Sequence, residues 1–194
     1  MKEKICVFAL LIFASVGLCF GQSKKAEEDL QYKLLATTKT STMQKELDET
    51  AAKGYRIIVG SPTSGTEIAI FLERVTTSDA PYKYKLLATT RTGTMQKELN
   101  EAAVEGYRLL PRTMIAKAQL IAGVEIVMIL EKPPVVERQY DYKLLATNLT
   151  GTLQKEVTAA EKDGYVIVGM VSRGEHMVIM ERESNAKTAD NIRK

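Results

Sequence analysis

The hexapeptide Tyr-Lys-Leu-Leu-Ala-Thr occurs three times in this chain of 194 residues, and this repetition constrains the fold more than any other feature. The copies lie at 32–37, 84–89 and 142–147. Downstream of each copy, Gln-Lys-Glu and then Gly-Tyr recur in the same order, and eight related residues close each repeat. Because whole sets of matching segments recur in order, the sequence predicts one structural element that is built three times.

The closing segments and the linkers between them give the bounds of the repeats. The closing segments read EIAIFLER, EIVMILEK and EHMVIMER, and polar or proline-containing stretches follow the first two. We therefore expect three repeats with the bounds 30–75, 82–132 and 140–182. The polar residues 183–194 are expected to form a flexible tail.

The periodicity within each repeat predicts a strand followed by a helix. In the second repeat, residues 84–89 alternate between two faces, which is typical of a β-strand. Apolar residues at helical spacing follow from Met95 to Ala103, which predicts an amphipathic helix of about three turns. We expect Thr94 to cap this helix and Gly106 to end it.

Two further strands complete each repeat. The second begins at the Gly-Tyr pair, and the closing segment forms the third, whose middle is apolar on both faces and should therefore be central in its sheet. Pro111 in the second strand of repeat two favours an edge position there, because proline lacks a ladder donor. The predicted fold class is α+β, with three tandem βαββ repeats, each a three-stranded sheet with one helix. A repeat this short buries little surface alone, so we expect one compact body.

The second repeat has the longest connection between its last two strands, with 18 positions from Tyr107 to Glu125. Insertions in regular repeats tend to lie on the functional face. The sequence therefore predicts candidate interaction residues at Arg112, Lys117 and Gln119. The alternative is that the extra residues lengthen a hairpin or cover a sheet edge.

The N-terminus resembles an export signal. Lys2 and Lys4 precede an apolar run that ends at Phe20, and small residues precede Gln22. This layout predicts a signal peptide over 1–21 that is cleaved before Gln22. Both cysteines of the chain would be removed with it, which excludes disulfides from the mature protein. We expect a periplasmic or secreted protein without a transmembrane span after cleavage; the alternative is that the apolar run is kept as a membrane anchor.

Composition argues against several classes of function. A net charge of +3 is too small and too evenly spread to indicate nucleic-acid binding. With the single histidine at His176, the sequence offers no metal-ligand set and no catalytic triad. Each closing segment carries two glutamates, such as Glu125 and Glu131, but six residues of strand span roughly 20 Å, too far for a glycosidase pair. We therefore expect no catalytic residues, no metal and no cofactor, and we expect that the protein is not an enzyme.

The loops that lead from the first strand into the helix are candidate ligand sites. They combine hydroxyl groups, a basic side chain and exposed amides at a helix start, which together can hold an anion. The candidate residues are Thr40 and Thr42 in repeat one and Arg91, Thr92, Gly93 and Thr94 in repeat two. The alternative interpretation is ordinary turn and capping chemistry.

The segment from Lys97 to Tyr107 resembles bacterial domain-of-unknown-function families that are built from short βαββ modules. Their signature is a polar helix with Leu-Asn, followed by Gly-Trp or Gly-Tyr before a hairpin that ends in a basic residue. Here Asp48 and Thr158 replace Asn100 in the other repeats, and tyrosine stands where tryptophan is frequent. The resemblance covers all three repeats and implies the βαββ fold, and it implies no activity.

Three copies of a scaffold without a catalytic constellation favour a binding protein. The hypothesis we favour is an exported, non-catalytic repeat protein that contacts an unknown protein or another component of the bacterial envelope. The alternative is a protein that binds a small ligand or anion through the threonine-rich loops. An enzyme is the third possibility, and the sequence gives it the least support.

Overall fold

The computed structural model describes residues 30–63, 66–75, 80–119 and 123–184. The chain divides into Met1–Leu30 and Gln31–Lys194, and every element below belongs to the second unit. That unit is α+β, with three helices and three small antiparallel sheets in the described residues. The predicted signal peptide over 1–21 lies outside the described residues. Of the predicted tail 183–194, Glu183 and Ser184 belong to the last strand instead, and the rest lies outside the described residues.

The secondary structure forms three consecutive groups, which we call modules 1, 2 and 3. Module 1 contains β1 (Tyr32–Thr37), α2 (Thr40–Ala51), β2 (Tyr55–Pro62) and β3 (Ile68–Arg74). Module 2 contains β4 (Lys83–Thr89), α3 (Thr92–Val104), β5 (Arg108–Leu109), the 3₁₀ helix η1 (Pro111–Thr113), β6 (Ile115–Gln119) and β7 (Gly123–Lys132). Module 3 contains β8 (Gln139–Thr147), α4 (Thr150–Lys162), β9 (Val166–Ser172) and β10 (His176–Ser184).

In each sheet the closing strand lies between the other two. The orders are β1-β3-β2, β4-β7-β5 and β8-β10-β9, and β6 also pairs with β7. The prediction that the closing strand is central is therefore confirmed. Each closing strand is hydrogen-bonded along both edges. In modules 2 and 3 its middle residues are buried on both faces, whereas in module 1 one face of β3 leaves Phe71 exposed.

The second strand of module 2 is broken in two. Pro111 begins η1, which separates β5 from β6, and both short strands pair with β7 at the same edge of the sheet. Proline cannot donate a backbone hydrogen bond, so the break falls where the ladder can tolerate it. The edge position predicted from Pro111 is confirmed, and the extra residues of this hairpin form η1 and β6.

The helix ends differ in part from the prediction. Thr94 does not cap α3, because the helix begins at Thr92 and its N-cap is Arg91. Instead, the hydroxyl of Thr89 accepts a hydrogen bond from the Arg91 N–H at 3.1 Å and closes the turn before the helix. The predicted stop is confirmed at Gly106, whose φ of 90° lies in the region that glycine tolerates best.

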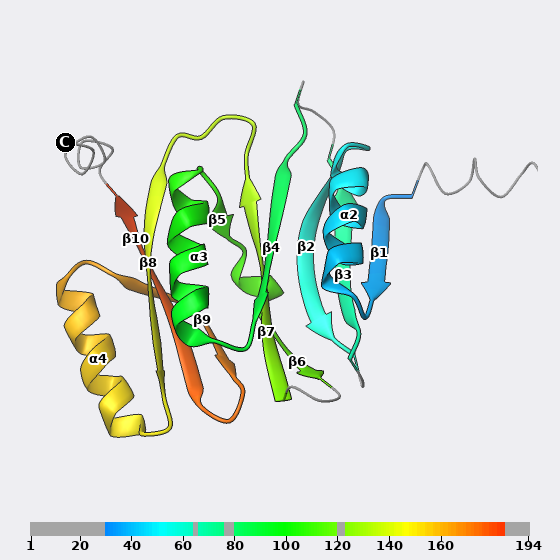
Figure 1. Cartoon of the computed structure of the whole chain (residues 1–194). Helices are drawn as coiled ribbons and strands as arrows, with labels where there is room; N and C mark the ends of the chain where they lie inside the picture. Colours follow the sequence, from blue (N-terminus) through cyan, green and yellow to red (C-terminus); the bar gives the residue numbers. More distant parts are fainter. Residues whose placement is uncertain (1–29, 64–65, 76–79, 120–122, 185–194) are drawn as a thin grey trace, which may run out of the picture. The chain divides into compact units, whose positions relative to one another are not determined.

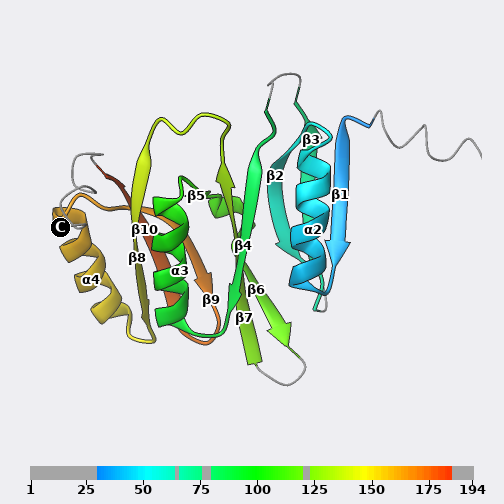
Figure 2. The same cartoon turned by 45° about the horizontal axis from the view of Figure 1, so that its top comes forward.

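The three sheets follow one another along the unit Gln31–Lys194, with α2, α3 and α4 packed against them (Figures 1 and 2). α2 contacts both its own β1 and β4 of the next module, and α3 likewise contacts β4 and β8. α4 lies at the end of this series against β8 and β10. Neighbouring repeats therefore share their hydrophobic cores, as predicted, because each of the first two helices packs against its own module and against the next one.

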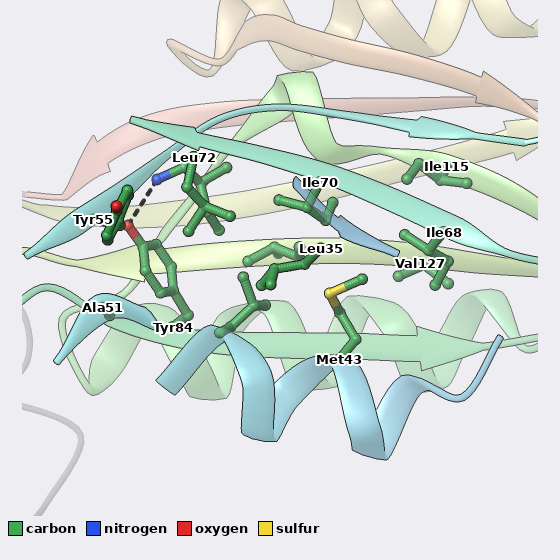
Figure 3. Packing of buried hydrophobic residues seen from close by; sticks show 13 residues of the cluster. Leu35, Met43, Ala51, Tyr55, Ile68, Ile70, Leu72, Tyr84, Ile115 and Val127 are labelled. Atoms are coloured by element: carbon green, nitrogen blue, oxygen red, sulfur yellow. Dashed lines mark hydrogen bonds between the residues drawn. The ribbon is translucent and has the colours of Figure 1, made fainter. Parts of the chain in front are cut away.

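Two large hydrophobic clusters follow from this arrangement. The first joins Met43 and Leu47 of α2 to the module 1 sheet and to one face of the module 2 sheet, which contributes Val127 and Ile129. Figure 3 shows Met43, Ile68 and Val127 of this cluster close together, with Tyr84 directed toward Tyr55. A second cluster joins α3 and the opposite face of the module 2 sheet to module 3, and only a small cluster lies under α4.

Candidate functional site

A tyrosine, a glutamate and an arginine join module 1 to module 2. Tyr84 pairs with Glu131 in the sheet, and its hydroxyl donates to Oε2 of that carboxylate at 3.1 Å. Arg56 binds the same carboxylate from β2, with Nη2 2.7 Å from Oε1 and Nε 3.0 Å from Oε2. The Tyr84 hydroxyl also accepts a hydrogen bond from the Ile57 N–H at 3.1 Å. Such two-point, charge-assisted contacts fix orientation, so this cluster sets how the two modules meet.

The same cluster recurs between modules 2 and 3. Tyr142 donates to Oε2 of Glu181 at 2.8 Å and accepts from the Leu109 N–H at 2.8 Å. Arg108 binds Glu181 with Nη2 2.7 Å from Oε1 and Nε 3.1 Å from Oε2. The guanidinium of Arg108 also stacks on Tyr140, 4.3 Å from the ring centre. Since two interfaces use the same side chains in the same geometry, they are two copies of one docking mode.

Burial decides the ionisation of these tyrosines. Removal from water raises the pKa of both Tyr84 and Tyr142 well above the ordinary value of 10.0, and the neighbouring glutamates raise it further. The hydrogen bonds that Arg56 and Arg108 donate to Glu131 and Glu181 raise the pKa of both arginines as well. At neutral pH the tyrosines are therefore neutral donors and the arginines are cations, which suits a structural contact and not proton transfer.

A glutamine on each of the first two helices binds the first strand of the following module. Gln44 of α2 donates from Nε2 to the Tyr84 carbonyl at 3.0 Å and accepts from the Leu86 N–H at 2.7 Å. Gln96 of α3 makes the same pair of contacts with Tyr142 and Leu144, at 2.8 and 2.6 Å. A side-chain amide that satisfies one donor and one acceptor of a strand fixes its register against the helix.

The loops before the first two helices receive a basic side chain from the following module. Lys117 of β6 is buried and donates from Nζ to the Thr38 carbonyl at 2.6 Å. Arg173 of module 3 donates to the Thr90 carbonyl and, at 2.6 Å, to the Thr92 hydroxyl. Lys117 and Thr92, which the sequence predicted as interaction and ligand residues, therefore both have partners within the chain.

The other predicted site residues lie apart from one another. Thr40, Arg91, Thr92, Gly93 and Thr94 lie at the starts or first turns of two different helices, and Thr42 lies one position before the buried Met43. Thr40 lines a hollow of about 310 Å³ that also includes Glu98, whose negative charge opposes anion binding. Arg112 is exposed on η1, and Gln119 donates to Glu125 within its own hairpin at 2.6 Å.

A larger cavity of about 530 Å³ opens beside the two arginine–glutamate pairs. Its lining includes Tyr82, Pro111, Val135 and Tyr140. It also includes both pairs themselves together with Glu137 and Arg138, so its cations and carboxylates balance. The cavity therefore offers aromatic and apolar surface without a net charge.

Apolar side chains that are buried inside the series of modules are exposed at its two ends. Tyr32 of β1 is 57% exposed, whereas its counterparts Tyr84 and Tyr142 are 3% and 2% exposed. Ile167 of β9 is 56% exposed, whereas its counterpart Ile57 is 8% exposed. The interface that joins module 1 to module 2, and module 2 to module 3, thus has one half exposed on module 1 and the other half exposed on module 3.

The residues that join the modules were not among those predicted from the sequence. Glu131 and Glu181 were expected only as parts of closing segments, and Arg56 and Arg108 were given no role. The signal was present in the tripeptide Gly-Tyr-Arg, which recurs in repeats one and two. In repeat three, Val166 follows Gly-Tyr in place of the arginine. The arginine is therefore present in the two repeats that another repeat follows and absent from the last one.

The described residues contain no group of three or more histidine, cysteine, aspartate or glutamate side chains that could hold a metal ion. None of the helices in residues 30–63, 66–75, 80–119 and 123–184 has the length and apolarity that a membrane crossing requires. Comparisons with protein-family models, with curated proteins and with solved structures each found no significant match to the chain.

Proposed function

We propose that this chain is an exported, non-catalytic protein of three tandem βαββ repeats that acts through protein or surface contacts in the bacterial envelope. The observation that carries the proposal is the exposure of Tyr32, Leu34 and Phe71 at one end of the series and of Val166 and Ile167 at the other. Contiguous exposed apolar side chains on a folded protein mark interaction sites. Terminal repeats that face only water normally carry polar residues there.

The polar clusters support the same proposal. The buried side chains of Tyr84, Glu131, Tyr142 and Glu181 join neighbouring modules, and the raised pKa of Tyr84 and Tyr142 keeps their hydroxyls protonated. Because these hydroxyl and carboxylate groups are already hydrogen-bonded within the chain, they stabilise the scaffold and are not available to react with a substrate. Export is supported by the signal-like sequence 1–21, and the proposal includes relationship to the βαββ families that the Gly-Tyr motif resembles.

Capture from an envelope extract tests this function. The full chain is expressed with its own N-terminus and immobilised, and bound proteins are compared with those on Ile167→Asp. We expect a partner that the natural chain captures and this variant loses. Val104→Asp is the matched control, because Val104 is an exposed apolar residue on α3, away from the terminal faces. The absence of any partner at low and high salt would contradict the proposal.

Small-ligand binding is the second candidate, and the cavity of about 530 Å³ is the observation that favours it. Its size is sufficient for a small organic molecule, and Tyr82 and Tyr140 provide aromatic surface. A ligand that binds the native state raises the unfolding midpoint. A thermal-shift screen of anions and metabolites should show a rise that Val135→Trp abolishes and that Leu149→Trp, an exposed residue elsewhere, retains.

A further inference from the structure

In modules 1 and 2, the helix packs against the first strand of the following module. Module 3 has the corresponding surface, on α4 and β9. In α2, Met43 and Leu47 are fully buried between two sheets, whereas their counterparts in α4, Leu153 and Val157, are only half-buried. On the adjoining strand β9, Ile167 is exposed where Ile57 and Leu109 are buried. The helix and strand that hold the next module elsewhere are therefore uncovered here.

The glutamine that binds the next strand is also present in α4. Gln154 occupies the position of Gln44 and Gln96, each of which makes two hydrogen bonds to the backbone of the following module. Within the described residues, the Gln154 amide donates instead to the neighbouring Thr158 at 3.3 Å. The contact to Thr158 lies on the helix surface, so a strand can replace it without breaking the fold.

The first module presents the matching half. Tyr32 and Leu34 of β1 are exposed and stand in the positions of Tyr84 and Leu86. Phe71 of β3, which pairs with Leu34, is exposed, whereas its counterpart Ile129 is fully buried. Glu73 pairs with Tyr32 in the sheet, as Glu131 pairs with Tyr84, so the carboxylate of the cluster is in place too.

We propose that the chain associates head-to-tail with a second copy of itself, in which α4 and β9 of one copy receive β1 of the next. By the geometry of the two internal interfaces, Gln154 would bind the Tyr32 carbonyl and the Leu34 N–H of the other copy. The Tyr32 hydroxyl would lie between the Ile167 N–H of one copy and Glu73 of its own. This inference names the partner in the proposed function and rests on that function.

A second copy fits these faces because the equivalent faces within the chain are covered by other modules of the same chain. The surface uncovered on module 3 is covered in modules 1 and 2 by a following module, and module 1 has the same strand sequence that fills that position, Tyr-Lys-Leu-Leu-Ala-Thr. Such an interface joins two different faces, so it either closes into a ring or continues as a filament.

One substitution makes the contact between copies weaker than the internal ones. Val166 stands where Arg56 and Arg108 bind a glutamate, so the Glu73 carboxylate of the next copy would have no guanidinium partner. A buried carboxylate that lacks its cation opposes association. Assembly should therefore be reversible and depend on concentration, and Val166→Arg should strengthen it by restoring the missing pair.

Sedimentation velocity over a range of protein concentrations tests the proposal with the full chain expressed from its complete sequence. We expect the average mass to rise with concentration. Val166→Arg should tighten association by about tenfold or more, given the coupling measured for close charge pairs at interfaces. Adding Glu73→Gln to Val166→Arg should remove this gain. A natural chain and a Val166→Arg chain that both stay monomeric would overturn the proposal.

Two blocked chains test the head-to-tail order. Tyr32→Asp disrupts the exposed face of module 1 and leaves that of module 3 intact, whereas Ile167→Asp disrupts the face of module 3 and leaves that of module 1 intact. Each variant alone should stay monomeric, and an equimolar mixture should form a dimer and nothing larger. A mixture that remains monomeric while the natural chain associates would overturn the proposal. In a head-to-tail contact, the intact face of one variant can bind the intact face of the other, whereas in a contact between two identical faces the variants would not complement each other. Val104→Asp should associate like the natural chain, and circular dichroism should show that all variants are folded.

Failure of this inference is distinguishable from failure of the proposed function. A chain that is monomeric in every measurement, yet captures an envelope protein that Ile167→Asp loses, overturns self-association and leaves the proposed function standing. A chain that neither associates nor captures a partner overturns both.

Discussion

The hydroxyl of Tyr84 in module 2 lies 3.1 Å from the backbone nitrogen of Ile57 in module 1 and accepts its hydrogen bond. The same hydroxyl donates to Glu131, which in turn binds Arg56. One side chain thus satisfies a backbone donor of the preceding module and orients a carboxylate of its own. This relationship ties the position of Tyr84 in module 2 to the backbone of module 1.

Tyr84→Phe should destabilise the protein. The substitution keeps the ring but leaves the Ile57 N–H without its acceptor in a buried position, which costs about 1–3 kcal/mol. Urea unfolding of the full chain measures the loss. Tyr32→Phe is the control, because at concentrations where the chain is monomeric the exposed Tyr32 should change the free energy of unfolding by less than about 0.5 kcal/mol. Equal effects at the two positions would contradict the role given to Tyr84.

Stability should fall as the pH rises above about 10. The pKa of Tyr84 and of Tyr142 is raised in the folded protein, so the unfolded chain releases these protons first and the folded state keeps them. Below the ordinary pKa of 10.0 both states are protonated, and the stabilisation is fully present. Above it, each tyrosine removes about 1.4 kcal/mol per pH unit. Urea unfolding at pH 9, 10 and 11 measures this slope, which the double variant Tyr84→Phe/Tyr142→Phe should reduce.

The local structure was predictable because it depends on nearest neighbours in the sequence. Alternation over residues 84–89 and the helical spacing after Met95 identified strand and helix, and the doubly apolar closing segment identified the central strand. The cap of α3 was misplaced at Thr94 because Thr90 and Thr92 lie close before it, and any of these threonines can serve as a cap. The hydroxyl that closes the turn is that of Thr89, one further back in the chain.

The contacts between modules could not be predicted in the same way. Arg56 and Glu131 are 75 positions apart, and no local pattern pairs one with the other. The loops chosen as ligand sites had the right composition for an anion, but the sequence did not show that Arg173 would bind the Thr92 hydroxyl. Recurrence of Gly-Tyr-Arg was the one available signal, and its meaning depends on how the repeats stack.

Gln96→Ala should destabilise the chain more than Gln154→Ala. Gln96 accepts from the N–H of Leu144 and donates to the carbonyl of Tyr142, which also accepts from Asn100. Its removal leaves the partly buried Leu144 N–H without this acceptor and costs about 1–3 kcal/mol. Gln154 is exposed on α4, and at concentrations where the chain is monomeric its removal should be neutral within about 0.5 kcal/mol. Chemical unfolding of both variants at low protein concentration makes the comparison, and a larger effect at Gln154 would refute it.

Gly106→Ala should be destabilising and Gly93→Ala stabilising. At Gly106 the φ of 90° strains any residue with a Cβ atom, and the added carbon would lie 2.9 Å from a methyl group of Val136. We expect a loss of about 1–2 kcal/mol. Gly93 lies inside α3 with no heavy atom within 4 Å of an added Cβ, so alanine should raise stability by about 0.5 kcal/mol. Thermal unfolding of both variants gives the two signs, and a Gly106→Ala variant at least as stable as the natural chain would show that the backbone at Gly106 is not constrained as described.

Module 2 alone, residues 82–132, should not fold as a stable monomer. Tyr84, Val127 and Ile129 pack against module 1, and the opposite face of the same sheet packs against module 3. Isolation would expose these three side chains at a cost of roughly 1.5–3 kcal/mol each, which together is comparable to the whole stability of a small domain. Circular dichroism with urea, combined with sedimentation to establish that the fragment is monomeric, should show a gradual loss of signal. A sharp, reversible transition of the monomeric fragment would mean that α3 and its own sheet suffice, and that the contacts between modules serve only to orient them.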